Sequence, residues 1–269
     1  MKLSISTLGC PTWSFDKIIS EYKKIGVCGI EVRGINGTMN FAEIPEFSDD
    51  NTTKTLNILK ENGMELVGFG ASSSFHDKEK HEKNISEAML TVDYAKKLGV
   101  PRIRVFGNNI SHEDPDESIK NIIEGLSKVC EYAEKCEVTV CLEIHGDINT
   151  AERLEKIINA LKKYRSFAIL WDVCHTFTAY ENDIDEVYEV IKPYVDHVHI
   201  KDAVRENGKT VIRTLGEGKI NVEGIVKRLI ADGYDGYFSF EHEKVWHKDL
   251  PEPEVEFPKF VEYMKKLNI

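Results

Sequence analysis

Acidic and histidine side chains follow four apolar segments in the second half of the chain. The segments read VTVCLEIHGD, AILWDVCH, VDHVHIKD and YFSFEHE. The residues at their ends that could do chemistry are Glu143, Asp172, His199 and Glu241. Three carboxylates brought close together repel one another unless a cation lies between them. The four residues therefore predict a site for one divalent metal ion.

The donor types indicate which ions would fit this site. Oxygen-rich ligation with one imidazole suits Mn²⁺ or Mg²⁺ best, with Co²⁺ and Zn²⁺ as alternatives. A single acid at a strand end is more often ion-paired or solvated, and a lone inward histidine is more often a core residue. Four such residues at the ends of successive strands favour a metal over these structural roles.

Short β-branched and apolar runs along the whole chain predict the strands that position these residues. Helical periodicity fills the intervals between them. The expected strands are Leu3–Ser6, Gly29–Arg33, Met64–Phe69, Ile103–Phe106, Val138–Glu143, Phe167–Asp172, Val195–Ile200 and Tyr237–Glu241. The expected helices are Asp16–Ile25, Asn51–Asn62, His81–Leu98, Asp116–Lys135, Thr150–Lys163, Ile184–Ile191, Val222–Ala231 and Phe257–Leu267.

Glycine marks the end of several expected helices. Gly26, Gly63, Gly99 and Gly233 each follow a helical pattern, where a left-handed residue is favoured. Repeated strand–helix units in one uniform chain predict a closed (β/α)₈ TIM barrel rather than an open sheet. No linker or change of composition divides the chain, so we expect one domain over residues 1–269.

Alternation along the strands decides which side chains point into the barrel. Glu143 and His145 share one face of their strand, and His199 shares a face with His197 and Lys201. Barrel active sites form at the carboxyl ends of the strands. We therefore expect the four metal ligands to converge at that end.

Composition limits the partners. The chain has 269 residues, 35 Lys and Arg against 46 Asp and Glu, and a formal net charge of −11. This acidic balance, without a basic stripe, argues against nucleic acid as a partner. No segment predicts a signal peptide or a membrane span, and the 6 cysteines show no C-x-x-C pairing. These features predict a cytoplasmic protein with reduced thiols, and they leave the oligomeric state open, a homo-oligomer included.

At these residues the chain resembles the xylose isomerase-like barrel superfamily, and within it the sugar phosphate isomerase/epimerase group. The matching pieces are the Glu of CLEIHG, the D-x-x-H of WDVCH, the second His of HVHIKD, and the GEGKINVEGIVKRLIADGYDGYFSFE stretch with its final acid. The resemblance implies that Glu143, Asp172, His199 and Glu241 hold the metal. It also implies that Glu143 and Glu241 move the proton.

The resemblance implies substrate-binding residues as well. His175, three residues past Asp172, and Arg205, six past His199, match residues that bind substrate in ketose epimerases. We add His145 and Trp13 as candidate pocket residues near the barrel opening. One departure is Asn149, which stands where the ketose epimerases use a Glu. The substrate class is therefore a sugar, sugar phosphate or polyol whose identity the sequence leaves open.

The chemistry implied is proton transfer beside a carbonyl, through an enediolate that a divalent metal would stabilise. One carboxylate removes the proton and the other returns it. A dehydratase acting on an inosose would share the metal and the proton abstraction. An apurinic endonuclease needs further histidines that the fourth strand, RIRVFGNN, lacks. A non-catalytic sugar-binding barrel would need neither proton-moving carboxylate.

Overall fold

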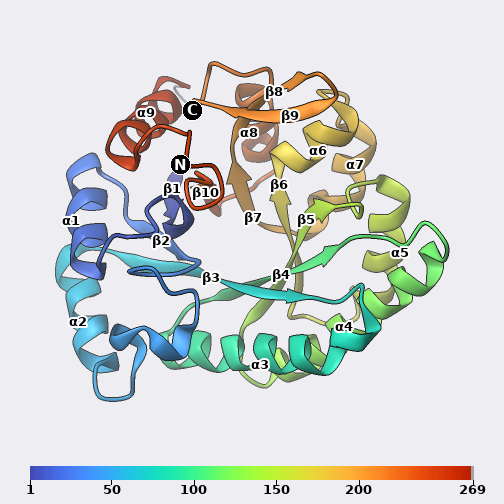
Figure 1. Cartoon of the computed structure of the whole chain (residues 1–269), viewed down its shortest axis with the longest axis horizontal. Coiled ribbons are helices and arrows are strands. Elements are labelled where there is room, and N and C mark those ends of the chain that lie inside the picture. The colour runs from blue at the N-terminus through green and yellow to red at the C-terminus, as the bar shows by residue number, and fades with distance from the viewer. Residues whose placement is uncertain (268–269) are drawn as a thin grey trace. The chain divides into compact units, whose positions relative to one another are not determined.

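The computed structural model describes residues 1–267 and has eight parallel strands that close into a barrel. The strand order around the barrel is β1-β10-β7-β6-β5-β4-β3-β2, so strands that follow one another in the chain are neighbours (Figure 1). This arrangement confirms the predicted (β/α)₈ class. The barrel strands are β1 (Lys2–Ser6), β2 (Gly29–Val32), β3 (Glu65–Ser74), β4 (Arg102–Asn108), β5 (Thr139–Gly146), β6 (Phe167–Asp172), β7 (Val195–Ile200) and β10 (Tyr237–Phe240).

Helices occupy the connections between the strands, as the periodicity predicts. Each connection returns the chain to the start of a new parallel strand. The helices are α1 (Phe15–Ile25), α2 (Thr52–Asn62), α3 (His81–Leu98), α4 (Pro115–Glu134), α5 (Ala151–Leu161), α6 (Val173–Tyr180), α7 (Asp185–Ile191), α8 (Val222–Ala231) and α9 (Pro253–Lys266). Five short 3₁₀ turns, η1 (Thr7–Gly9), η2 (Phe41–Glu43), η3 (Pro45–Phe47), η4 (Lys78–Lys80) and η5 (Lys192–Tyr194), complete the connections within the described residues.

Local capping explains where α1 begins and ends. The Ser14 side chain accepts a hydrogen bond from the Lys17 N–H at the start of the helix. Gly26 ends it with φ of 79°, in the left-handed region where a Cβ is disfavoured. Gly63 ends α2 in the same way, with φ of 65°. The predicted glycine stops are confirmed at both helices.

Contacts within the chain define two compact units, and each is described separately. The first comprises residues 1–69 and 97–99 and the chain from His199 onward. In it β1 pairs in parallel with both β10 and β2, so that Ile5 lies opposite Phe240 on one side and Ile30 on the other. Helices α1 and α9 lie beside each other in this unit (Figure 1).

The second unit comprises residues 70–96 and 100–198. In it β5 lies between β4 and β6, with Leu142 opposite Val105 and Ile169. Helix α5 packs against α4 and α7 in this unit. The side chains of Leu142, Val105 and Ile169 are all fully buried, which explains the continuous apolar runs in these strands.

Two elements were not predicted. A hairpin of β8 (Asp202–Glu206) and β9 (Lys209–Arg213) follows β7 directly, and α6 starts immediately after β6. Two predicted bounds differ by four or more residues: β3 continues to Ser74, and α9 begins at Pro253 rather than at Phe257. The proline at the first position of α9 explains the earlier start, because its fixed φ suits a helix N-terminus.

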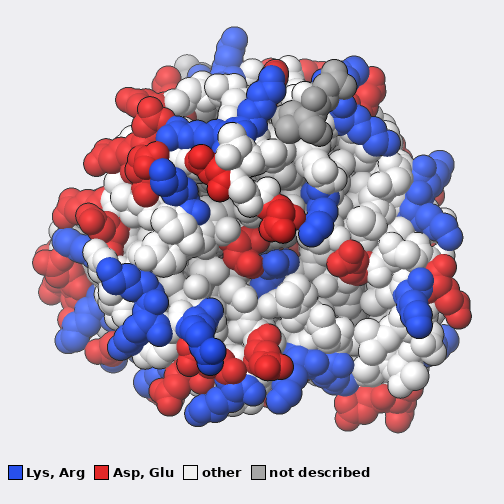
Figure 2. Space-filling view, turned by 180° about the vertical axis from the view of Figure 1, so that it is seen from behind, with Lys and Arg blue, Asp and Glu red and all other residues white. Residues whose placement is uncertain are grey.

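Acidic and basic side chains alternate on the face of the molecule in Figure 2, and neither sign forms a continuous stripe on that face. This pattern agrees with the absence of a basic run in the sequence. Among residues 1–267, no helix combines the length and apolar character needed to cross a bilayer.

Candidate metal centre

The four predicted ligands occupy the carboxyl ends of four consecutive barrel strands, β5, β6, β7 and β10. Glu143 and His199 lie within β5 and β7, Asp172 is the last residue of β6, and Glu241 directly follows β10. Their exposed fractions are only 1%, 0%, 0% and 5% for Glu143, Asp172, His199 and Glu241. Burial of four polar side chains in this way is unusual unless they act together.

Apolar residues lie one strand repeat before two of these ligands. Cys141, Ala168 and Leu170 form a buried cluster in the second unit. Cys141 precedes Glu143 by two residues, and Leu170 precedes Asp172 by two. Because alternate residues of a strand share a face, this cluster indicates that both carboxylates point to the barrel interior.

The donor set fits a divalent cation. Glu143 and Asp172 supply two buried carboxylates from the second unit, and His199 and Glu241 supply a buried imidazole and a buried carboxylate from the first. Three carboxylate oxygens and one imidazole nitrogen are a set that Mn²⁺, Mg²⁺, Co²⁺ and Zn²⁺ accept. The residues present therefore fit the group that the sequence predicts.

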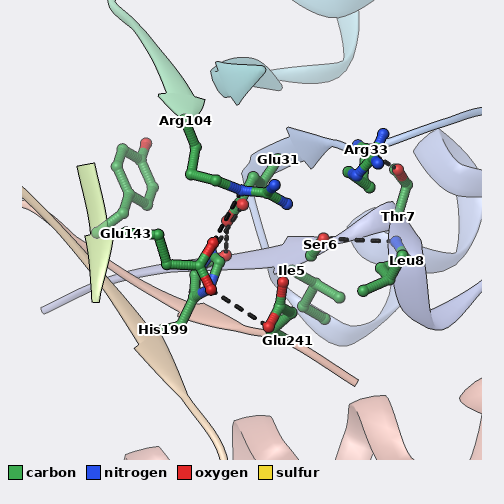
Figure 3. A network of polar contacts seen from close by, with 12 residues as sticks. Ile5, Ser6, Thr7, Leu8, Glu31, Arg33, Arg104, Glu143, His199 and Glu241 are labelled. Atoms are coloured by element: carbon green, nitrogen blue, oxygen red, sulfur yellow. Dashed lines mark hydrogen bonds and ion pairs between the residues drawn. The ribbon is translucent and has the colours of Figure 1, made fainter. Parts of the chain in front are cut away.

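In the first unit, Glu31 orients His199 (Figure 3). The Nε2 atom of His199 lies 2.8 Å from Glu31 Oε1, and its Nδ1 atom lies 3.4 Å from Glu241 Oε2. The Ser239 hydroxyl donates to the other Glu31 oxygen at 2.5 Å. An Nε2–H donated to Glu31 leaves the Nδ1 lone pair for a metal, the arrangement seen where a carboxylate supports a histidine ligand.

Lys201 is a buried cation beside Glu241. Its side chain is 2% exposed, and its Nζ lies 2.5 Å from both Glu241 Oε2 and Glu243 Oε1. Lys201 follows His199 by two residues, so the two share a strand face. That spacing indicated its inward position, but no sequence pattern indicated its two carboxylate partners.

In the second unit, Arg104 pairs with Glu143 (Figure 3). Arg104 Nε lies 2.9 Å from Glu143 Oε2, and both side chains are almost completely buried. The guanidinium also donates to the Ala71 carbonyl at 2.9 Å and lies over the Phe106 ring. The ion-pair partner of Arg104 in this unit is therefore a buried carboxylate.

These two cations change one part of the sequence argument. The prediction that the carboxylates require a metal to relieve their repulsion was too strong. Arg104 already forms an ion pair with Glu143, and Lys201 already forms one with Glu241. The case for a metal rests instead on the donor types and on the burial of all four side chains.

Asp172 is also the N-cap of α6. Its Oδ1 accepts hydrogen bonds from the Cys174 N–H at 2.8 Å and the His175 N–H at 3.3 Å. His175 therefore lies in the first turn of α6. Asn149, the residue that departs from the ketose epimerases, donates from its side-chain amide to the His175 carbonyl at 3.2 Å. In this chain Asn149 therefore contacts the backbone at the start of α6.

The other predicted substrate-binding residues lie in different surroundings. His145 and His175 stand together, with ring centroids 4.1 Å apart. Arg205 is exposed on β8 and donates to Thr210 Oγ1 and the Gly208 carbonyl of its own hairpin, at 2.8 Å and 3.0 Å. Trp13 lines a cavity of about 450 Å³ together with Lys17 and Lys244. Lys17 lies over the Trp13 ring, 4.3 Å from its centroid.

Comparison with known proteins finds several that are similar to this chain in sequence or in fold. A curated relative, fructoselysine 3-epimerase of Shigella flexneri, is 21% identical over 254 residues that cover 90% of each chain. Inosose dehydratase of Clostridium perfringens is 27% identical over 149 residues, 48% of each chain. The crystal structure of an IolI protein with a bound zinc atom superposes with a TM-score of 0.77 at 19% identity, covering 100% of this chain and 96% of that one.

A family model gives the decisive match, because it extends over nearly the whole chain. The model described as "Xylose isomerase-like TIM barrel" matches residues 19–267. The strand order and this match lead to one conclusion: the chain belongs to the xylose isomerase-like TIM barrel family.

Proposed function

We propose that this protein is a divalent-metal-dependent isomerase or epimerase that acts on a ketose-like sugar or sugar phosphate. The observation that carries the proposal is the burial of Glu143, Asp172, His199 and Glu241 at the carboxyl ends of four barrel strands. The relative named fructoselysine 3-epimerase, which aligns over 90% of the chain, supports the same reaction class.

The two glutamates are assigned to proton transfer. A divalent cation held by the four ligands would supply stabilisation of negative charge that develops beside a substrate carbonyl. Glu143 and Glu241 come from β5 and from the end of β10, so they approach from different strands. One carboxylate removes the proton on the carbon next to the carbonyl. The other returns it to the same carbon or to its neighbour, which gives epimerisation or isomerisation respectively.

Arg104 and Lys201 each form an ion pair with one of these two carboxylates. Each basic side chain holds one oxygen of its carboxylate, which fixes the orientation of Glu143 and Glu241. An ionised carboxylate is the form required of the residue that accepts the first proton. His145 and His175 are proposed to contact substrate, because both are partly exposed and adjacent to Glu143.

A dehydratase is the second candidate. It is favoured by the relative named inosose dehydratase, which aligns with about half of the chain. Proton abstraction would be unchanged, and a hydroxyl on the next carbon would leave as water. Both reactions use the same ligands and the same first step, so the products distinguish them.

The test is a panel of ketoses, ketose phosphates and inososes, incubated with Mn²⁺ in D₂O and followed by NMR. Deuterium uptake beside the carbonyl with a new epimer or aldose selects the isomerase, and loss of water selects the dehydratase. If the metal-bound protein shows neither deuterium exchange nor turnover on any of these substrates, both candidate functions are contradicted.

Matched variants attach the activity to the site. Glu143→Gln and Glu241→Gln should each lower turnover by at least about 100-fold, as expected when a general acid–base group is removed. Asp172→Asn should chiefly weaken metal binding. Glu262→Gln, which removes an exposed carboxylate paired with Lys266 on α9, is the control and should leave turnover unchanged.

A further inference from the structure

Two histidines and one glutamate form a second group of donors in the second unit. Glu143, His145 and His175 each offer a ligand atom, and these atoms lie within 4.8 Å of one another. Glu143 thus belongs to two groups of potential ligands. The second group contains two imidazole nitrogens and one carboxylate oxygen, a different chemistry from the oxygen-rich first group.

The backbone fixes the three residues by independent means. Glu143 and His145 are alternate residues of β5 and so share one face of the strand. His175 is held in the first turn of α6, where its N–H donates to Asp172 and its carbonyl accepts from Asn149. The three donors therefore come from one strand and from one helix whose start is capped.

The rings are also held by their neighbours. The His145 and His175 centroids lie 4.1 Å apart, with 51° between the ring planes. The Phe106 ring meets His145 edge-on, with its centroid 4.9 Å away. The two imidazoles are close together, and the Glu143 carboxylate lies within 4.8 Å of a nitrogen of each. Little movement is therefore needed for all three to bind one ion.

Exposure separates this group from the first. Glu143 is 1% exposed, whereas His145 and His175 are partly exposed. A site with three protein ligands and an opening to solvent keeps at least one coordination position for water or substrate. Two histidines and one glutamate are a ligand set in which Zn²⁺ is commonly bound with such an open position.

We propose that Glu143, His145 and His175 form a second divalent-cation site, selective for Zn²⁺ over Mg²⁺ and Mn²⁺, and that Glu143 is shared with the first site. The selectivity follows from the two imidazoles, which suit Zn²⁺, whereas Mg²⁺ and Mn²⁺ favour oxygen ligands. The inference extends the proposed metal centre but does not depend on the sugar reaction.

The test counts Zn²⁺ ions bound to the purified full-length chain by equilibrium dialysis and elemental analysis. Wild-type protein should bind two Zn²⁺ per chain. His145→Ala and Asp172→Asn should each bind one, because each removes a ligand from a different site. Loss of a direct ligand should lower affinity for that ion by about 100-fold or more, since removal of an outer partner alone costs 10–100-fold.

Two further variants complete the experiment. His112→Ala removes an exposed histidine from the segment before α4 and should still bind two ions. His175→Gln replaces His145→Ala if the latter does not fold, as judged by circular dichroism. A repeat with Mn²⁺ alone should give one ion per chain in both wild-type protein and His145→Ala.

The outcomes separate the two proposals. One Zn²⁺ per wild-type chain, or two that persist in His145→Ala and His175→Gln, would overturn the second site. In that case the two histidines keep only the substrate-binding role. Two ions that persist in Asp172→Asn would instead contradict the first site, on which the proposed function rests.

Discussion

At the scale of single residues, Glu31 holds His199 in the orientation that a metal ligand requires. It contacts Nε2 at 2.8 Å and is itself fixed by the Ser239 hydroxyl. A carboxylate that supports a histidine ligand raises the basicity of the ring and fixes its tautomer. We therefore expect Glu31 to affect metal binding through His199 rather than as a ligand.

Glu31→Gln is expected to weaken Mn²⁺ binding by 10–100-fold, the usual effect of removing such a partner. Isothermal titration with Mn²⁺ measures the change. Glu46→Gln, at a partly exposed position in the 3₁₀ turn η3, provides the comparison and should bind Mn²⁺ like the wild type. Unchanged affinity in Glu31→Gln would show that His199 does not depend on Glu31.

Lys201 has a role in stability that can be measured separately. Replacing it with Met leaves Glu241 and Glu243 buried or partly buried without their cation, and breaking a buried pair costs about 3–5 kcal/mol. Lys201→Met should lower the free energy of unfolding in urea by that order. The added change Glu243→Gln should recover part of the loss, because it removes one of the two uncompensated charges.

Lys227→Met is the matched control for this measurement. Lys227 makes an exposed pair with Glu223 on α8, and exposed pairs contribute at most about 1 kcal/mol. If Lys201→Met proved no more destabilising than Lys227→Met, the buried lysine would not be needed to hold the two carboxylates.

At the scale of elements, Asp202 organises the segment that follows the β8–β9 hairpin. Its Oδ2 accepts from the Gly216 and Gly218 N–H groups at 2.9 Å each, and its Oδ1 accepts from the Ile220 N–H at 3.1 Å. One buried carboxylate thus replaces the regular hydrogen bonds that this segment lacks. The segment leads directly into α8.

Gly218 is required by this close approach. A Cβ at Gly218 would lie 2.0 Å from Asp202 Oδ1 and 2.7 Å from the Ala203 backbone nitrogen. Gly218→Ala should therefore destabilise the protein by about 2 kcal/mol or more in urea unfolding, through displacement of the Asp202 hydrogen bonds.

The comparison variant is Gly208→Ala, in the turn of the hairpin. Gly208 has φ of +77° but open space around it, so alanine there should cost about 1 kcal/mol from backbone strain alone. A smaller loss for Gly218→Ala than for Gly208→Ala would contradict the role assigned to Asp202.

The sequence predicted the regular elements better than the irregular ones. Strand β6 has the predicted bounds, because its apolar run ends at a polar residue. Strand β7, which alternates apolar and polar residues, also has the predicted bounds. The β8–β9 hairpin was missed, although Asn207-Gly208 between the two strands is the typical sequence of a tight hairpin turn. Its strands are partly exposed and lack the apolar pattern of the barrel strands.

At the candidate site, the sequence predicted where the strand-end side chains lie but not which residues form ion pairs with them. Alternation along a strand assigns each side chain to a face, and this was enough to single out the four strand-end ligands. Which basic residue meets which carboxylate depends on register between strands far apart in the sequence. For this reason the contacts of Arg104 with Glu143 and of Lys201 with Glu241 appear only in the structure.

At the scale of the whole molecule, the thiols are reduced. All six cysteines are free, as the sequence predicted, and four of them are buried. Burial raises the pKa of the Cys130 thiol to about 12, and that of Cys10 to about 12. The thiolate is the reactive form, and at pH 8 only about one Cys10 or Cys130 side chain in 10⁴ would be ionised.

Native protein at pH 8 should therefore leave Cys10 and Cys130 unmodified by a maleimide, while Cys28 and Cys136, which are partly exposed, should react first. Peptide mass spectrometry after timed labelling measures the order. Labelling in 6 M guanidinium should modify all six and serves as the positive control. Early modification of Cys130 in the native protein would mean that α4 opens readily.

Asp172 has a consequence for the interpretation of other members of the family. Its Oδ1 starts α6, a task that asparagine, serine or threonine can also perform, whereas a carboxylate is needed to bind a cation strongly. A relative with Asn or Ser at this position would keep the strand-to-helix turn and lose a charged ligand. The amino acid found there should therefore distinguish barrels that have retained ion binding from those that have kept only the architecture.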